Sequence, residues 1–321
     1  MFLYAEARIV ELDLGPTLIT PLWMLLAFVG LGWLCARRLA IDPRPIATLL
    51  IYLIAPLTFF RGLILGGPTP TYLLLTLGSF VVASLICLLV QRLVRPFFPA
   101  QEAAVLAFSG GTGNTGYFGL PIAMVLLPPE GVTLYLFCLL GITLYEFTVG
   151  FYVSARGQFS VRQSLVKIAR LPLVYAFLAA LLASALEIAI PGPVMDSLAV
   201  FPATYTLLGM MIIGMTLGRV TIRELDARFI AACVVVRYGL WPLIALLVVV
   251  TLQTTIGIAP ELALALLLIG VVPMAANVVV VAMELSIRPE KGAIAVLVTT
   301  LVAPLLIPLY LEGLLRLTGL A

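Results

Sequence analysis

Two short segments of the chain contain residue types that can bind a polar solute. Residues 110–121 hold five glycines and a proline, and residues 270–277 hold one of each. The chain has only two asparagines, and Asn114 lies in the first segment and Asn277 in the second. An asparagine amide both donates and accepts hydrogen bonds, so it can hold a solute oxygen or satisfy an unpaired backbone N–H. Both segments are therefore candidates for a binding site.

The composition places these segments in a membrane. The 321 residues are 63% hydrophobic and 10% charged, whereas soluble domains have about 45–50% apolar and about 25% charged residues. The mean hydropathy is +1.21. These values exclude a soluble enzyme, a nucleic-acid-binding protein and a disordered scaffold. Histidine is absent and the four cysteines lie in apolar runs, so we expect no catalytic residue, metal site or cofactor.

Apolar runs bounded by charged residues, glycine and proline predict the spanning helices. We expect an all-α membrane protein with ten of them, over residues 17–36, 45–65, 71–91, 102–127, 131–154, 172–190, 197–218, 228–250, 261–284 and 292–315. The longest loop, 155–171, divides the chain into five-helix repeats at 1–154 and 172–321. Because five is odd, the second repeat has inverted topology. Such inverted repeats are typical of transporters.

The basic residues predict the orientation. Fourteen of the eighteen lie in loops on one side of the predicted spans, the 155–171 loop among them. Only Arg8, Arg61 and Arg316 lie on the other side, and Arg237 lies within a span. The positive-inside rule then predicts a multi-pass protein of the plasma (inner) membrane with a cytoplasmic central loop and both termini outside.

Each repeat has one interrupted span, the fourth and the ninth. The predicted helix breakers are Gly110, Gly111, Gly119, Pro121, Gly270 and Pro273. Unwound backbone is tolerated in a membrane only where it is buried in protein or lines a cavity. We therefore expect the two broken helices to cross at a substrate site formed by Gly113, Asn114, Thr115, Gly116, Tyr117, Ala276 and Asn277. The alternative is that these residues only kink helices for close packing.

Two charged residues lie deep within spans, Glu146 in the fifth and Arg237 in the eighth. Intramembrane charges usually pair with one another or line an aqueous path. One interpretation is a structural ion pair between Glu146 and Arg237. The other is functional, with Arg237 attracting an anion or Glu146 exchanging protons.

Segments 113–121 and 273–277, together with Thr299, Thr300 and Pro304 in the last span, resemble the signature segments of the auxin efflux carrier family. Ten spans and a short central loop are similar to its prokaryotic members. The resemblance implies a fold like that of sodium/proton antiporters and bile-acid symporters. Spans 1, 2, 6 and 7 would form a scaffold, and spans 3–5 and 8–10 a transport domain that moves like an elevator. A homodimer would form through the scaffold.

These observations favour a secondary transporter of small organic anions, either dicarboxylates or auxin-like aromatic carboxylates. No aspartate lies within a predicted span, which argues against cation exchange. A sodium-coupled solute symporter of the same fold is the first alternative, and a membrane receptor without flux is the second. The expected partners are the solute and membrane lipids, with no nucleic acid.

The predicted orientation can be tested by cysteine labelling of intact cells. A cysteine introduced at residue 5 or 320 is expected to react with a membrane-impermeant maleimide, whereas one in the 155–171 loop is not. The unsubstituted chain, with its four native cysteines, gives the background. Labelling of the central loop from outside would reverse the orientation.

Overall fold

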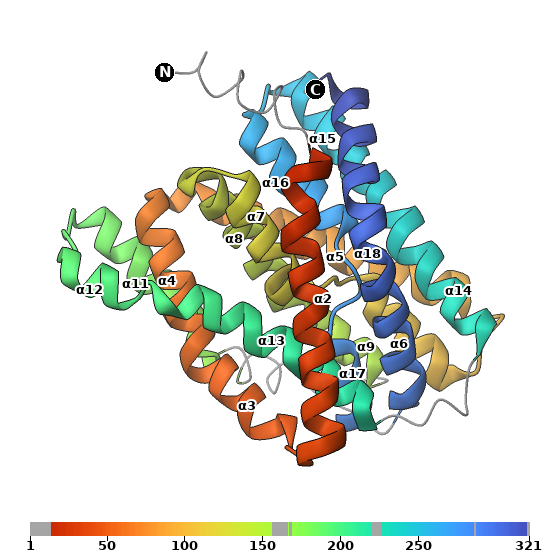
Figure 1. Ribbon diagram of the computed structural model, residues 1–321. Helices are drawn as coiled ribbons and strands as arrows, with labels where there is room; N and C mark the ends of the chain where they lie inside the picture. Colours follow the sequence, from red (N-terminus) through yellow and green to blue (C-terminus); the bar gives the residue numbers. More distant parts are fainter. Residues whose placement is uncertain (1–13, 156–165, 167–168, 220–225, 286, 320–321) are drawn as a thin grey trace.

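The computed structural model describes residues 14–155, 166, 169–219, 226–285 and 287–319, and within these ranges the chain forms helices and no strand (Figure 1). Most of the predicted loop at 155–171 lies outside the described residues. The first half contains α2 (Leu14–Leu39), α3 (Pro43–Leu49), η1 (Leu50–Ile54), α4 (Ala55–Gly66), η2 (Pro70–Tyr72), α5 (Leu73–Val94), α6 (Ala100–Gly110), η3 (Thr115–Gly119), α7 (Leu120–Leu126), α8 (Pro129–Tyr145), η4 (Glu146–Gly150) and α9 (Phe151–Ser154). The second half contains α11 (Pro172–Ala185), α12 (Gly192–Ser197), α13 (Val200–Arg219), α14 (Ala227–Val235), η6 (Val236–Leu240), α15 (Trp241–Thr255), α16 (Pro260–Val271), α17 (Asn277–Glu284) and α18 (Pro289–Thr318).

The described helices are those of a multi-pass membrane protein. Seven are long and apolar enough to cross a bilayer, at Pro16–Leu39, Pro43–Gly66, Pro70–Val94, Pro129–Ser154, Gly192–Arg219, Ala227–Thr255 and Pro289–Thr318. Their outer surface carries large apolar side chains, such as Trp23 at 61% exposure and Leu305 at 69%. A surface of this kind suits contact with lipid chains.

One group of helices is formed by α2, α3, α4, α11 and α13. Helix α13 packs along α2 and also contacts α3 and α4, while α11 packs on α4 (Figure 1). A side chain at Gly214 of α13 would collide with the backbone oxygen of Val29 on α2. The absence of that side chain lets the two backbones touch, as small residues do where membrane helices pack closely.

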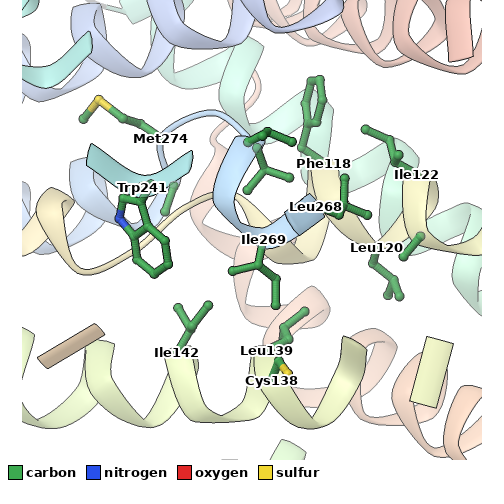
Figure 2. Close-up of a cluster of buried hydrophobic side chains, with 14 of the residues drawn as sticks. Phe118, Leu120, Ile122, Cys138, Leu139, Ile142, Trp241, Leu268, Ile269 and Met274 are labelled. Atoms are coloured by element: carbon green, nitrogen blue, oxygen red, sulfur yellow. The ribbon is translucent and has the colours of Figure 1, made fainter. Parts of the chain in front are cut away.

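A second group surrounds the two predicted interruptions. Helix α5 packs on α6 and α8, and α16 packs on α8, α15 and α18. Figure 2 shows how buried side chains from three segments meet there, with Ile122 after the first interruption, Leu139 on α8 and Leu268 on α16. This apolar packing holds the short helical pieces in place.

A charged cluster ties three helices of the second group together. The Lys291 ammonium lies 2.7 Å from Glu102 Oε1 and 2.7 Å from Asp226 Oδ2. Asp226 also caps α14, because its Oδ1 accepts from the Phe229 N–H at 3.1 Å. The hydrogen bond from Lys291 lowers the pKa of the Asp226 carboxyl. The cluster therefore joins the starts of α6, α14 and α18.

Replacing Lys291 by Met is expected to destabilise the protein at neutral pH. The change leaves two carboxylates without their shared cation, and hydrogen bonds to charged groups contribute about 1.5–3 kcal/mol each. A carboxyl with a lowered folded-state pKa stabilises the fold above its unfolded pKa of about 3.9, and that stability disappears as the pH falls through the folded-state value.

The difference in melting temperature between wild type and Lys291→Met should therefore be largest near neutral pH and become smaller below about pH 4. Arg316→Met is the matched control, because it removes an exposed pair with Glu312 that is worth about 0.3–0.5 kcal/mol. Equal melting temperatures for Lys291→Met and wild type would contradict a stabilising cluster.

Candidate functional site

Two helical segments in the described part of the chain are each broken by a few non-helical residues, and these two interruptions contact each other. Residues 111–114 separate α6 from η3, and residues 272–276 separate α16 from α17. The Asn114 N–H donates to the Pro273 carbonyl at 2.7 Å. Of the six predicted breakers, Gly110, Gly111 and Pro273 lie at or within the interruptions. Gly119, Pro121 and Gly270 lie in helical turns, so the unwound part of the first segment is shorter than its glycine content suggested.

Arg237 binds the carbonyl oxygens that both interruptions leave unpaired. Its guanidinium is 1% exposed. It donates to Ile269 O at 2.5 Å, to Val272 O, and to Thr112 O at 3.4 Å. These oxygens lie in the last turn of α16 or just after the carboxyl ends of α6 and α16, where the helix dipole is negative and a cation is favoured. Arg237 therefore stabilises both broken ends at once.

Aromatic side chains hold the rest of the first interruption. Trp241 Nε1 donates to Gly110 O at 2.8 Å, and its ring lies beneath the Arg237 guanidinium at 4.9 Å. The Tyr145 hydroxyl donates to Phe108 O at 2.9 Å, and the Tyr135 hydroxyl donates to Thr115 O at 2.8 Å. No motif or spacing in the sequence marks these residues. Their only signal is that each carries a hydrogen-bond donor within an apolar span.

A cavity of about 240 Å³ lies beside the two interruptions. All seven residues predicted for a substrate site line it: Gly113, Asn114, Thr115, Gly116, Tyr117, Ala276 and Asn277. The opposite wall comes from the first helix group, with Phe59 of α4 and Tyr205 and Ile213 of α13 among its residues. The cavity therefore lies between the two helix groups.

Asn114 lines this cavity and has an unused hydrogen-bond donor. The residue is 3% exposed, and its Oδ1 accepts from the Phe118 N–H at 3.3 Å. Its Nδ2 is buried and has no hydrogen-bond partner in the described part of the chain. A buried donor left unsatisfied costs about 1–3 kcal/mol. An occupant with an oxygen acceptor would remove that cost.

Glu146, which directly follows α8, binds a residue in or directly after each interruption. It is 7% exposed and begins the π-helical turn η4, a feature common at functional sites. Its Oε1 accepts from the Thr112 hydroxyl at 2.5 Å, and its Oε2 accepts from Asn277 Nδ2 at 2.8 Å. Among the described residues that line the cavity, Glu146 is the one with an ionisable carboxyl or basic side chain.

Glu146 and Arg237 do not form the direct ion pair that their positions in the sequence suggested. The guanidinium is occupied by backbone carbonyls, and the carboxylate is occupied by the hydroxyl and amide donors. Thr112 connects them, because its hydroxyl binds Glu146 and its carbonyl accepts from Arg237. Arg237 lies behind the cavity wall rather than in its lining.

Tyrosine rings close one side of the cavity. The rings of Tyr117 and Tyr205 lie 5.1 Å apart at 53°. Gly116 faces the Tyr205 hydroxyl so closely that any side chain there would collide with it. The Tyr117 ring is thus packed against α13 while still lining the cavity.

The fold is that of a multi-pass helical membrane protein with a cavity of about 240 Å³ beside two touching helix interruptions. No known protein family and no curated protein matches the chain.

Replacing Gly113 by Ala is expected to destabilise the protein. The added Cβ would lie 2.7 Å from the Arg237 guanidinium carbon, and the guanidinium cannot move without losing its carbonyl partners. Overpacking of this kind costs about 1–3 kcal/mol. Gly30→Ala is the control, because a Cβ at that position meets nothing within 4 Å. Thermal unfolding in detergent measures both. A Gly113→Ala protein as stable as Gly30→Ala would contradict the role given to Arg237.

Proposed function

We propose that the protein is a secondary active transporter of small organic anions. The observation that carries this proposal is that two helix interruptions meet at one cavity, where the buried Asn114 amide has a donor without an acceptor. Discontinuous helices that expose backbone and amide groups to a cavity form the substrate sites of many transporters.

The polarity of the interruptions supports an anionic solute. Arg237 covers the negative carboxyl ends of α6 and α16. The helical segments that begin at Thr115 and Asn277 start at the cavity, and the start of a helix favours negative charge. The Asn114 amide adds a side-chain donor at the same place.

The size and lining of the cavity support a small solute with an apolar body. Ligand pockets are commonly about 300–1,000 Å³, and this cavity of about 240 Å³ lies just below that range. Most of its lining residues are aliphatic or aromatic. An auxin-like aromatic carboxylate fits this description more closely than a dicarboxylate, which has little apolar surface.

For the architecture we propose ten spans in two inverted five-helix repeats, as in the auxin efflux carrier family. Three of the ten would be the shorter pieces α6 with η3 and α7, α11, and α16 with α17. The group of α2, α3, α4, α11 and α13, with α12, would be the scaffold, and the remaining helices would be the transport domain. A cavity bounded by both groups supports an elevator movement of one group along the other. In this proposal the protein lies in the plasma membrane with both termini outside, and it forms a homodimer through the scaffold.

Asn114→Asp and Asn277→Ala are expected to lower the affinity of saturable uptake at least tenfold while leaving the protein folded. The carboxylate introduced by Asn114→Asp would keep the acceptor for the Phe118 N–H but lose the amide donor. A hydrogen bond to a charged group is worth about 1.5–3 kcal/mol, which corresponds to about a tenfold or greater loss of affinity.

The measurement is uptake of radiolabelled malate and indole-3-acetate into proteoliposomes. Thr148→Val is the control, since its hydroxyl bonds within its own helix to Leu144 O and does not line the cavity. Uptake kinetics equal to those of wild type in both asparagine variants would contradict the proposed binding site.

A further inference from the structure

The negative charge of an ionised Glu146 would repel an anionic solute in the cavity unless that charge is neutralised. Glu146 lines the same 240 Å³ cavity as the Asn114 amide. An ionised carboxylate and an anion bound in the same cavity repel each other, and the repulsion is strong because little water screens it. We propose that Glu146 binds one proton together with each solute anion, so that the protein is a proton–anion symporter. This inference rests on the proposed function and names its coupling ion.

No cation neutralises Glu146 within the described structure. Its two oxygens accept from neutral donors, Thr112 and Asn277. The titratable and charged groups that face it are Tyr145 on its own helix, Tyr117 on η3, Tyr205 on α13 and Arg237 on η6. The phenols are neutral at physiological pH, and Arg237 is bound to backbone carbonyls.

The local hydrogen bonds can hold the carboxyl in either protonation state. The Thr112 hydroxyl donates to Glu146 Oε1 at 2.5 Å and has a second acceptor, Gly113 O, at 3.4 Å. When Oε1 carries a proton, the carboxyl donates to Thr112 Oγ1 and the Thr112 hydroxyl turns to Gly113 O. Asn277 Nδ2 continues to donate to Oε2 at 2.8 Å. The proton is therefore taken up with a hydroxyl rotation and no rearrangement of heavy atoms.

The stoichiometry follows from these two sites. One proton binds Glu146 and one carboxylate binds at the Asn114 amide from the same side, and both leave on the other side. A monocarboxylate and its proton carry no net charge together, so transport is electroneutral. A pH gradient then drives accumulation of the anion on the alkaline side.

The test compares wild type with Glu146→Gln in proteoliposomes loaded at one pH unit above the medium. The probes are radiolabelled indole-3-acetate and malate. Wild type is expected to show a saturable, pH-driven uptake of the monocarboxylate, above the passive entry of the neutral acid into protein-free liposomes, with a limiting accumulation of about tenfold for one pH unit. Glu146→Gln, a permanent mimic of the protonated state, is expected to exchange labelled for unlabelled solute but not to accumulate it. Glu130→Gln, at the exposed first turn of the same helix, should behave as wild type.

Proton uptake on binding gives a second readout that needs no variant. Titration calorimetry of wild type in two buffers of different ionisation enthalpy is expected to show one proton taken up per anion bound. If wild-type flux is saturable but independent of the pH gradient, and no proton is taken up on binding, proton coupling is contradicted. The proposed function as a transporter would not be affected by that result. A folded Glu146→Gln protein without exchange would make Glu146 a binding group instead. Absence of saturable wild-type flux of either probe would overturn the proposed function itself.

Discussion

The structure depends on one constraint, which is that backbone groups released by a broken helix must find partners where water is scarce. Arg237 provides hydrogen-bond donors for several of these groups. One buried guanidinium, 1% exposed, binds carbonyls from both interruptions, and a planar group with five donors is suited to several acceptors at once. Trp241, Tyr135 and Tyr145 supply further donors. These contacts come from α8 and from η6 with α15, so they join those helices and the two interruptions into one packed unit.

The same constraint determines the polarity of the cavity. Arg237 binds carbonyls of both interruptions outside the cavity lining, whereas the amide donor of Asn114, a lining residue, has no partner in the described part of the chain. One unpaired donor next to a largely apolar lining suits a small molecule with an oxygen acceptor and an apolar body. Glu146 is bound to Thr112 on one interruption and Asn277 on the other. A change in its charge would therefore alter hydrogen bonds at both interruptions.

Much of the candidate site could be predicted from residue types alone. Two asparagines in a chain of 321 residues, each beside glycine and proline in an apolar run, indicated where the interruptions lie and which residues line the cavity. Composition likewise indicated a helical membrane protein, and the hydropathy pattern indicated the order of its helices. The partners of the buried charges could not be predicted. Arg237 and Glu146 have similar positions in their spans, yet each binds groups more than thirty residues away. Likewise Lys291 meets Glu102 across 189 positions of sequence, and only tertiary packing brings such groups together.

The central claim is that the unused Asn114 amide binds the transported anion. It can be tested by nuclear magnetic resonance of protein labelled with nitrogen-15 at the asparagine side chains. Because the chain has only two asparagines, the spectrum contains two side-chain amide groups, and an Asn277→Ala sample assigns them. A saturating concentration of a transported carboxylate is expected to shift the Asn114 amide signal, since its free N–H gains a charged acceptor. If both amide signals stay unchanged at a concentration that saturates transport, the solute does not bind at the interruptions and the account is contradicted.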